Sequence, residues 1–141
     1  LRAEGYLKAL KDNNILLDES IILRTDSEED LSYKIREISD SRPIDAIFAL
    51  EESDSVAALK YGLKQGRKIP EELSVIGFAD GILASRRLSP SLTTVSQHGV
   101  EIGEVAARLL IDRLESEEEN KPYETVIIKT VLKERESTRN S

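Results

Sequence analysis

The sequence predicts an α/β fold in which a parallel sheet is flanked by helices on both faces. The first observation is that short apolar segments alternate along the chain with longer segments whose apolar residues recur at helical spacing. The second is that the strand-like segments are apolar and β-branched almost throughout, which is typical of strands buried on both faces. Helices alternating with such strands favour a parallel sheet covered on its two sides.

Four segments are predicted to be helices because their apolar residues recur three or four positions apart. Local signals mark their ends. Thr25, Asp26 and Ser27 are capping residues, and Pro43 breaks the second helix. Gly66 is expected to cap the third helix at its carboxyl end. The predicted helices cover residues 2–14, the segment from these caps to about residue 40, 52–65 and about 100–117.

Short apolar runs between these helices are predicted to be strands, at residues 21–23, 45–50, 73–78, 92–95, 125–128 and 130–132. The tail at 133–141 is polar and is expected to fray. Gly77 stands where a strand meets an irregular loop, a usual place for a ligand or another backbone to approach closely. Because ligands of open α/β sheets bind at the carboxyl ends of strands, the residues just after Phe78 are the first binding-site candidates.

Length and composition restrict the function. A chain of 141 residues is one domain by length, and its formal net charge of −7 would repel nucleic acid. No apolar run is long enough to span a membrane, and no basic-then-apolar leader opens the chain. The absence of cysteine excludes disulfides and thiolate metal sites. The absence of methionine leads us to expect a piece of a longer protein.

No catalytic constellation is present, so we expect no enzyme, no metal site and no cofactor. The single histidine, His98, lacks the partners that a nucleophilic dyad or metal site needs and is interpreted as a polar residue leading into a helix. Glycine-rich phosphate loops are absent. The mostly acidic run at 115–119 lacks the alternating ligands of a calcium loop and is interpreted as a solvated linker.

Three charged motifs have two readings each. Glu51 and Glu52 follow a strand and open a helix, where they either complement the helix dipole or face a cleft and accept hydrogen bonds from sugar hydroxyls. Asp80 is either a turn residue or a ligand acceptor. The pair Arg86 and Arg87 is either an ordinary surface pair or part of a protein interface.

Six short motifs occur in order along nearly the whole chain. They are R-A-E-G-Y-L-K-A-L at 2–10, A-I-F-A at 46–49, V-I-G-F-A-D at 75–80, P-S-L-T-T-V at 90–95, G-E-V-A-A-R-L-L at 103–110 and R-E-S-T at 135–138. Each motif is weak alone, but their ordered set is specific and resembles the regulatory domain of the lactose-repressor/galactose-repressor (LacI/GalR) family of bacterial transcription factors.

This resemblance implies the C-terminal lobe of a two-lobed, periplasmic binding protein-like sensor. Residues 1–98 would form that lobe, and residues 99–118 a helix that crosses to the N-terminal lobe in the intact family fold. Residues 119–141 would be a linker, terminal strands and tail. The DNA-binding headpiece would be absent, in keeping with the acidic charge.

The resemblance also implies effector-binding positions. Arg2 matches an arginine that grips the effector in the family, and its guanidinium offers a planar, bidentate donor set. Glu51 falls where many members have an effector-contacting Asn, and Ala79 where many have an effector-binding Asp, with Asp80 beside it. Ionised Glu only accepts hydrogen bonds, and Ala79 offers no acceptor, so we expect an effector different from simple hexoses.

The family dimerises through this lobe, which the resemblance maps to seven residues. Three of them, in the helix after Glu52, have the intradomain core as an equally favoured reading. The expected interface residues are Val56, Leu59, Lys60, Leu63, Leu83, Arg87 and Leu88. The apolar stripe of the helix at 100–117 lacks its family partner in this chain. We therefore expect this helix to pack back on the lobe or against another chain.

The resulting hypothesis is a non-enzymatic, cytoplasmic sensor and dimerisation domain of a LacI-type regulator. It would bind a sugar or related small molecule between two lobes, form a homodimer, and act on DNA only through a headpiece outside this chain. The alternative is a periplasmic solute-binding protein, which shares the lobe architecture. The R-E-S-T and P-S-L-T-T-V motifs favour the regulator.

Overall fold

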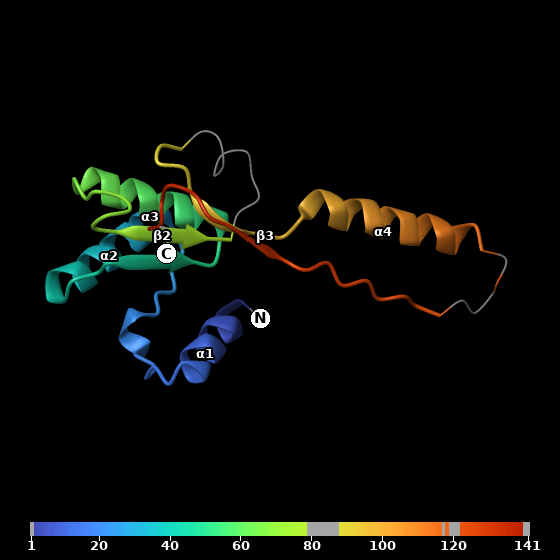
Figure 1. The fold of residues 1–141 in the computed structure, drawn as a ribbon, viewed down its shortest axis with the longest axis horizontal. Coiled ribbons are helices and arrows are strands. Elements are labelled where there is room, and N and C mark those ends of the chain that lie inside the picture. The colour runs from blue at the N-terminus through green and yellow to red at the C-terminus, as the bar shows by residue number, and fades with distance from the viewer. Residues whose placement is uncertain (1, 79–87, 117, 119–121, 140–141) are drawn as a thin grey trace.

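A computed structural model describes residues 2–78, 88–116, 118 and 122–139 (Figure 1). They form a mixed α/β body built on a four-stranded sheet, from which one long helix projects. The strands are β1 (Ala46–Ala49), β2 (Ser74–Gly77), β3 (Thr93–Ser96) and β4 (Val131–Lys133), in the spatial order β1-β2-β3-β4. The predicted α/β class is confirmed, and the sheet, which was predicted to be parallel, is mostly parallel.

Three strands of the sheet run parallel and the fourth does not. Ala46 pairs with Ser74 and Ala49 with Gly77 along β1 and β2, while β2 and β3 are paired only at Ile76–Thr93 and Gly77–Thr94. Strand β4 runs antiparallel to β3. The chain leaves β3, makes one long excursion outward and returns beside it, and this reversal of direction makes the edge strand antiparallel.

Helices α2 (Glu28–Ser41) and α3 (Glu52–Lys64) pack on the sheet and form the core with it. Ser27 caps α2 as expected, because its Oγ accepts a hydrogen bond from the N–H of Asp30 at 3.1 Å. Burying each large apolar side chain of the core stabilises the fold by about 1.5–3 kcal/mol. The core cluster is Leu31, Ile35, Ala57, Ala58, Leu59, Leu73, Val75 and Leu92.

Helix α1 (Arg2–Asp12) lies on the other side of the sheet from α3 (Figure 1). Because side chains alternate along a strand, Ile47 packs on the core whereas Phe48 points to the α1 side. The rings of Tyr6 and Phe48 lie 6.4 Å apart, and those of Phe48 and Phe78 lie 5.9 Å apart. An aromatic row thus connects α1 to the ends of two strands.

Gly77 permits close contact between β2 and α3. A Cβ atom at this position would lie 2.4 Å from the Cβ of Ser55, closer than two carbon atoms can approach. A close approach at Gly77 is therefore present, but the approaching group is the Ser55 side chain of a helix in the same domain, not the expected ligand or backbone.

Two predicted strands are absent. Residues 21–23 follow a 3₁₀ turn, η1 (Glu19–Ile21), in which Asp18 accepts hydrogen bonds from the N–H and Oγ of Ser20 at 3.0 and 2.5 Å. These local bonds compete with strand pairing. Residues 125–128 are extended but pair with no neighbour, and a short segment without an adjacent edge cannot form a ladder.

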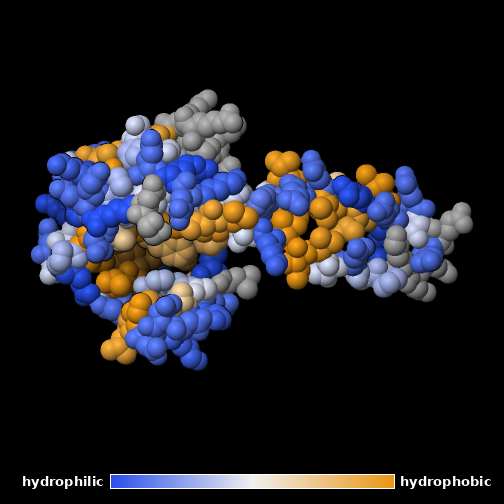
Figure 2. All heavy atoms as spheres, in the orientation of Figure 1, coloured by the Kyte–Doolittle hydropathy of each residue, from blue (hydrophilic) through white to orange (hydrophobic). Residues whose placement is uncertain are grey.

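Helix α4 (Gly99–Leu114) projects from the end of β3, and the returning chain runs alongside it (Figure 1). None of its residues is buried, and Val100 and Leu114 are 79% and 75% exposed. Figure 2 shows an apolar surface along this projection. In this structure the helix does not pack back on the lobe, because it leads away from the end of β3; packing against another chain, the other expected arrangement, stays a prediction.

The C-terminal tail does not fray as expected. Ser137 is fully buried, and Arg135 donates from Nη1 to the carbonyl oxygen of Leu92 at 2.5 Å and to Thr94 Oγ1 at 2.9 Å. Glu136 accepts hydrogen bonds from the N–H and Oγ of Ser91, at 2.8 and 2.9 Å, which lower the pKa of its carboxyl group. The polar residues of this segment are hydrogen-bonded anchors.

Candidate functional site

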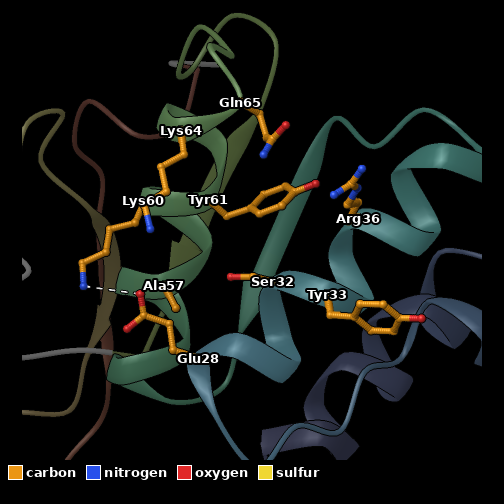
Figure 3. A pocket seen from close by; sticks show the side chains of 9 residues that line it. All are labelled: Glu28, Ser32, Tyr33, Arg36, Ala57, Lys60, Tyr61, Lys64 and Gln65. Carbon is orange, nitrogen blue, oxygen red and sulfur yellow. Dashed lines mark ion pairs between the residues drawn. The ribbon is translucent and has the colours of Figure 1, made fainter.

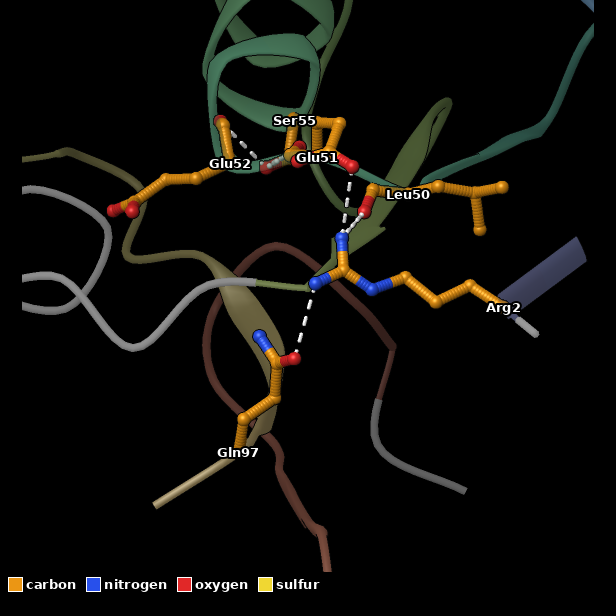
Figure 4. A network of polar contacts seen from close by, with 6 residues as sticks. All are labelled: Arg2, Leu50, Glu51, Glu52, Ser55 and Gln97. Atoms are coloured by element: carbon orange, nitrogen blue, oxygen red, sulfur yellow. Dashed lines mark hydrogen bonds and ion pairs between the residues drawn. The ribbon is translucent and has the colours of Figure 1, made fainter. Parts of the chain in front are cut away.

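The guanidinium of Arg2 is the centre of a polar network at the carboxyl edge of the sheet (Figure 4). Its Nη1 donates to the carbonyl oxygen of Leu50 and, at 3.0 Å, to Glu51 Oε1. Its Nη2 donates to Gln97 Oε1 at 3.0 Å. The carbon at the centre of the guanidinium lies 4.9 Å from the centroid of the Phe78 ring, a cation–π arrangement.

The topology of the sheet assembles this network. Leu50 and Glu51 follow β1, Phe78 follows β2, and Gln97 follows β3. Parallel strands end at the same edge, so residues separated by almost fifty positions become neighbours. Arg2 reaches them from the first turn of α1. This edge is where open α/β sheets bind ligands.

The start of α3 adds negative charge to the same edge. Glu51 is the N-cap residue of α3 but makes no side-chain cap bond, because its carboxylate is paired with Arg2 instead. The side chain of Glu52 turns away from Arg2 in Figure 4. Its Oε1 is the buried side-chain polar atom that lacks a hydrogen-bond partner among the described residues. Burial and the charge of Glu51 raise the pKa of Asp54.

Ser55 fixes the first turn of α3 against the sheet. It is fully buried, and its Oγ donates to the carbonyl oxygens of Glu51 and Glu52 at 3.0 and 2.8 Å. A hydroxyl can satisfy these groups without leaving a polar atom unpaired in the core. Together with the contact to Gly77, this holds Glu51 in place over the strand ends.

Two of the four predicted effector residues are brought together, namely Arg2 and Glu51. The other two, Ala79 and Asp80, lie outside the described residues. Sequence reasoning missed Gln97 and Phe78 as site residues. Both directly follow a strand, as Glu51 does, so extending the strand-end argument to β2 and β3 would have found them.

The predicted interface residues are distributed between the core and the surface. Leu59 is fully buried in the core of its own chain, in agreement with the intradomain reading that the sequence left open for it. Val56 is half-buried, Lys60 is exposed, and Leu63 is 44% exposed. Leu88 packs against the core cluster while partly exposed. Leu83 and Arg87 lie outside the described residues.

A separate groove lies between α2 and α3 (Figure 3). Its charged groups are largely paired: Lys60 Nζ lies 3.5 Å from Glu28 Oε1, and Arg36 Nε lies 3.9 Å from Asp40 Oδ2. It is lined by helical side chains on the core side of the sheet, away from the strand ends. The lining residues are Glu28, Ser32, Tyr33, Arg36, Ala57, Lys60, Tyr61, Lys64 and Gln65.

Within the part of the chain that the structure describes, no group of three or more His, Cys, Asp or Glu side chains could hold a metal ion. No described helix combines the length and apolarity that a membrane crossing requires. The Arg2 network, which places hydrogen-bond donors and acceptors side by side, is therefore the candidate ligand site among the described residues.

Comparison with known proteins matches residues 1–138 to the model of a periplasmic binding protein-like domain. The chain is 34% identical over 141 residues to the HTH-type transcriptional regulator MalR of Clostridium butyricum, which covers 99% of this chain and 41% of MalR. The chain thus spans less than half the length of the curated relatives that it matches.

Solved structures share the fold. A LacI family transcriptional regulator from Enterococcus faecium with bound ribose matches with a TM-score of 0.83 and 30% identity, covering 97% of this chain and 50% of that one. A complex of the transcriptional regulator CelR with cellobiose matches with a TM-score of 0.78 and 31% identity, covering 96% of this chain and 41% of that one.

Proposed function

The chain belongs to the periplasmic binding protein-like domain family, in the form found in LacI-type transcriptional regulators, and we propose that it is the effector-sensing and dimerising part of such a regulator. The effector is a sugar or a related small molecule. The chain senses it without catalysing a reaction, as expected for a relative of regulators that are not enzymes.

The observation that carries this proposal is the Arg2 network at the carboxyl edge of the sheet. A guanidinium beside a carboxylate and a carboxamide offers hydrogen-bond donors and acceptors together, as a polyhydroxy ligand requires. Ribose and cellobiose in two relatives of the same fold support a carbohydrate effector. We assign effector contacts to Arg2 and Glu51, and to Ala79 and Asp80 by their place after β2.

We propose that residues 1–98 form the C-terminal lobe of the sensor and that residues 99–118 cross to a first lobe. The exposed apolar side of α4 supports this assignment, because solvating it is unfavourable and a first lobe would cover it. We assign residues 119–141 as linker, terminal strands and tail; of these, residues 122–130 run back along α4 and β4 then joins the edge of the sheet. A helix-turn-helix headpiece outside this chain would bind DNA, in the cytoplasm.

Ligand control follows from differential affinity. An effector that contacts both lobes binds the closed arrangement more tightly than the open one and shifts the population toward it. In a dimer, lobe closure changes the spacing of the two DNA-binding heads.

We propose that the dimer contact uses the outer side of α3 and the segment that leads into β3. Val56, Lys60 and Leu63 are spaced along one side of α3 and remain at least partly exposed. Leu88, with Leu83 and Arg87 before it, supplies the second part of this surface. Leu59 contributes from beneath by supporting the helix.

The competing function, a periplasmic solute-binding protein, would share the lobe and its ligand site. The named relatives are regulators of transcription, and the chain has the R-E-S-T motif, which is part of its resemblance to the LacI/GalR family. These observations favour the regulator.

The test is ligand-dependent DNA binding by the full-length protein. We expect calorimetry against ribose, cellobiose, maltose and cytidine to identify a ligand, and that ligand to change the affinity for the operator upstream of the protein's own gene. Ligand binding without any change in DNA affinity would favour the solute-binding alternative. Absence of both activities would overturn the proposal.

A further inference from the structure

Arg2 is already paired with a carboxylate of its own chain. A guanidinium has five N–H donors, and three of the hydrogen bonds of Arg2 go to Leu50, Glu51 and Gln97. The Arg2 side chain is 34% exposed and the Glu51 side chain 67% exposed, so both face the space at the strand ends. The positive charge expected at a ligand-gripping arginine is therefore offset within the site.

Among the described residues, the charges around Arg2 do not restore a positive potential. Glu51, Glu52 and Asp54 all lie in the first turn of α3 or just before it. The described network opposes these three carboxylates with one guanidinium. Burial is the main cause of the raised pKa of Asp54, and the negative charge of Glu51 adds to it.

The amino end of α3 acts in the opposite direction, because the free N–H groups of a helix start attract anions. Its effect equals about half an elementary charge, which is smaller than the excess of carboxylates in the same turn. Negative potential therefore prevails at this end of the helix.

An ion pair of this kind suits a neutral polyol. One hydroxyl of a vicinal diol can accept from Arg2 while the next donates to Glu51, so both partners stay hydrogen-bonded. A phosphate or carboxylate could accept a hydrogen bond from Arg2. It would then lie beside the Glu51 carboxylate on the same guanidinium, and the two negative charges would repel each other. The pair thus distinguishes ligands by charge.

We infer that this site selects effectors without negative charge, namely neutral or amine-bearing sugars and nucleosides rather than sugar phosphates or sugar acids, and that Glu51 sets this selection. The inference rests on the proposed function, since it names the effector class of the same site. Glu51 acts as a specificity-determining residue in it.

The experiment uses matched ligand pairs with the full-length protein. Calorimetry compares ribose with ribose 5-phosphate, and glucose and glucosamine with glucose 6-phosphate. We expect the uncharged or amine-bearing member to bind at least about tenfold more tightly, with the preference weakening as salt is added.

Glu51→Gln keeps the length of the side chain and removes its charge, so the preference should fall by about tenfold or more. Glu51→Asn also removes the charge, so it should lower the preference for the uncharged or amine-bearing ligand as well. Glu71→Gln is the matched control: this exposed residue precedes β2, at the opposite end of the strand, and its substitution should leave the preference unchanged. Thermal melting of each variant checks that it is folded.

Tighter binding of the phosphorylated member by the unmodified protein would overturn the inference while upholding the proposed function. An unchanged preference in both Glu51 variants would overturn the role of Glu51 in this selection, and it would also leave the proposed function standing. Failure of all these pairs to bind, with failure of cellobiose, maltose and cytidine and no ligand-dependent DNA binding, would overturn the proposed function, and the inference with it.

Discussion

Ser137 and Val75 are joined twice, by a backbone and a side-chain hydrogen bond. The N–H of Val75 donates to the carbonyl oxygen of Ser137 at 2.8 Å, and Ser137 Oγ donates to the carbonyl oxygen of Val75 at 2.5 Å. The same Oγ accepts from the N–H of Thr93 at 2.8 Å. The C-terminal segment thus bridges β2 and β3 at the beginning of their short paired region.

We expect Ser137→Ala to destabilise the protein by about 2–3 kcal/mol, because it leaves a buried carbonyl and a buried N–H without partners. Urea unfolding followed by circular dichroism measures the change. Ser53→Ala, at an exposed position of α3, is the control and should change the stability by less than about 0.5 kcal/mol. Equal stability of the two variants would show that the bridge contributes nothing.

We expect Gly77→Ala to cost about 1–3 kcal/mol or more, since the new methyl group would overlap Ser55. Ser55→Gly in the same chain should recover part of this loss, which a double-mutant cycle would measure as a coupling energy. Gly5→Ala is the control, because a Cβ atom there meets nothing within 4 Å and alanine favours a helix. A strictly additive cycle would contradict the proposed overlap.

We expect Arg2→Lys to weaken effector binding by about tenfold or more, although it keeps the positive charge. A single ammonium cannot reproduce the fork that reaches Leu50, Glu51 and Gln97 together. Calorimetry on the full-length protein, with the ligand that the screen identifies, measures the loss. The control is Arg24→Lys, at an exposed position before α2. Unchanged affinity in Arg2→Lys would remove Arg2 from the site.

We expect the carboxyl group of Asp18 to titrate with a pKa of about 2, below its usual value of 3.8. The hydrogen bond from the Ser20 hydroxyl is the main cause, followed by the one from Arg42. A depressed pKa in the folded state means that the contribution of this group to stability is present above pH 3.8 and is lost as the pH falls toward 2.

Carboxyl-carbon NMR titration measures this pKa directly. Ser20→Ala should raise it, and Arg42→Ala should raise it less. An ordinary pKa for Asp18 in the unmodified protein would contradict the hydrogen bonds of η1.

Periodicity was sufficient for the helices, since an amphipathic helix shows its pattern within one segment. It was insufficient for strands, because a strand also needs an adjacent edge. Residues 92–95 have such an edge and lie almost entirely within β3, whereas residues 125–128 have none and stay unpaired. Neighbouring strands are set by topology, which local pattern does not contain.

The polar C-terminal tail is a second case in which local sequence pattern did not predict the tertiary contacts. A polar sequence at the end of a chain is typical of fraying, but Ser137 is buried because every polar atom of its side chain has a partner on β2 or β3. For the site, the resemblance supplied Arg2 and Glu51. Their direct pairing with each other could not be predicted, since it depends on how α1 lies on the sheet.

The exposed side of α4 gives the last prediction, for the isolated 141-residue chain. Leu110 and Leu114 lie on one side of this helix and are 58% and 75% exposed. Burying each such side chain is favourable by about 1.5–3 kcal/mol, so we expect two copies of the isolated chain to associate through α4. The variant Leu110→Lys/Leu114→Lys should shift the chain toward monomer in analytical ultracentrifugation, because two ammonium groups resist burial. Glu101→Lys, which adds positive charge at an exposed position on the opposite side of α4, is the matched control and should still associate. A monomeric unmodified chain at high concentration would show that water alone covers this surface.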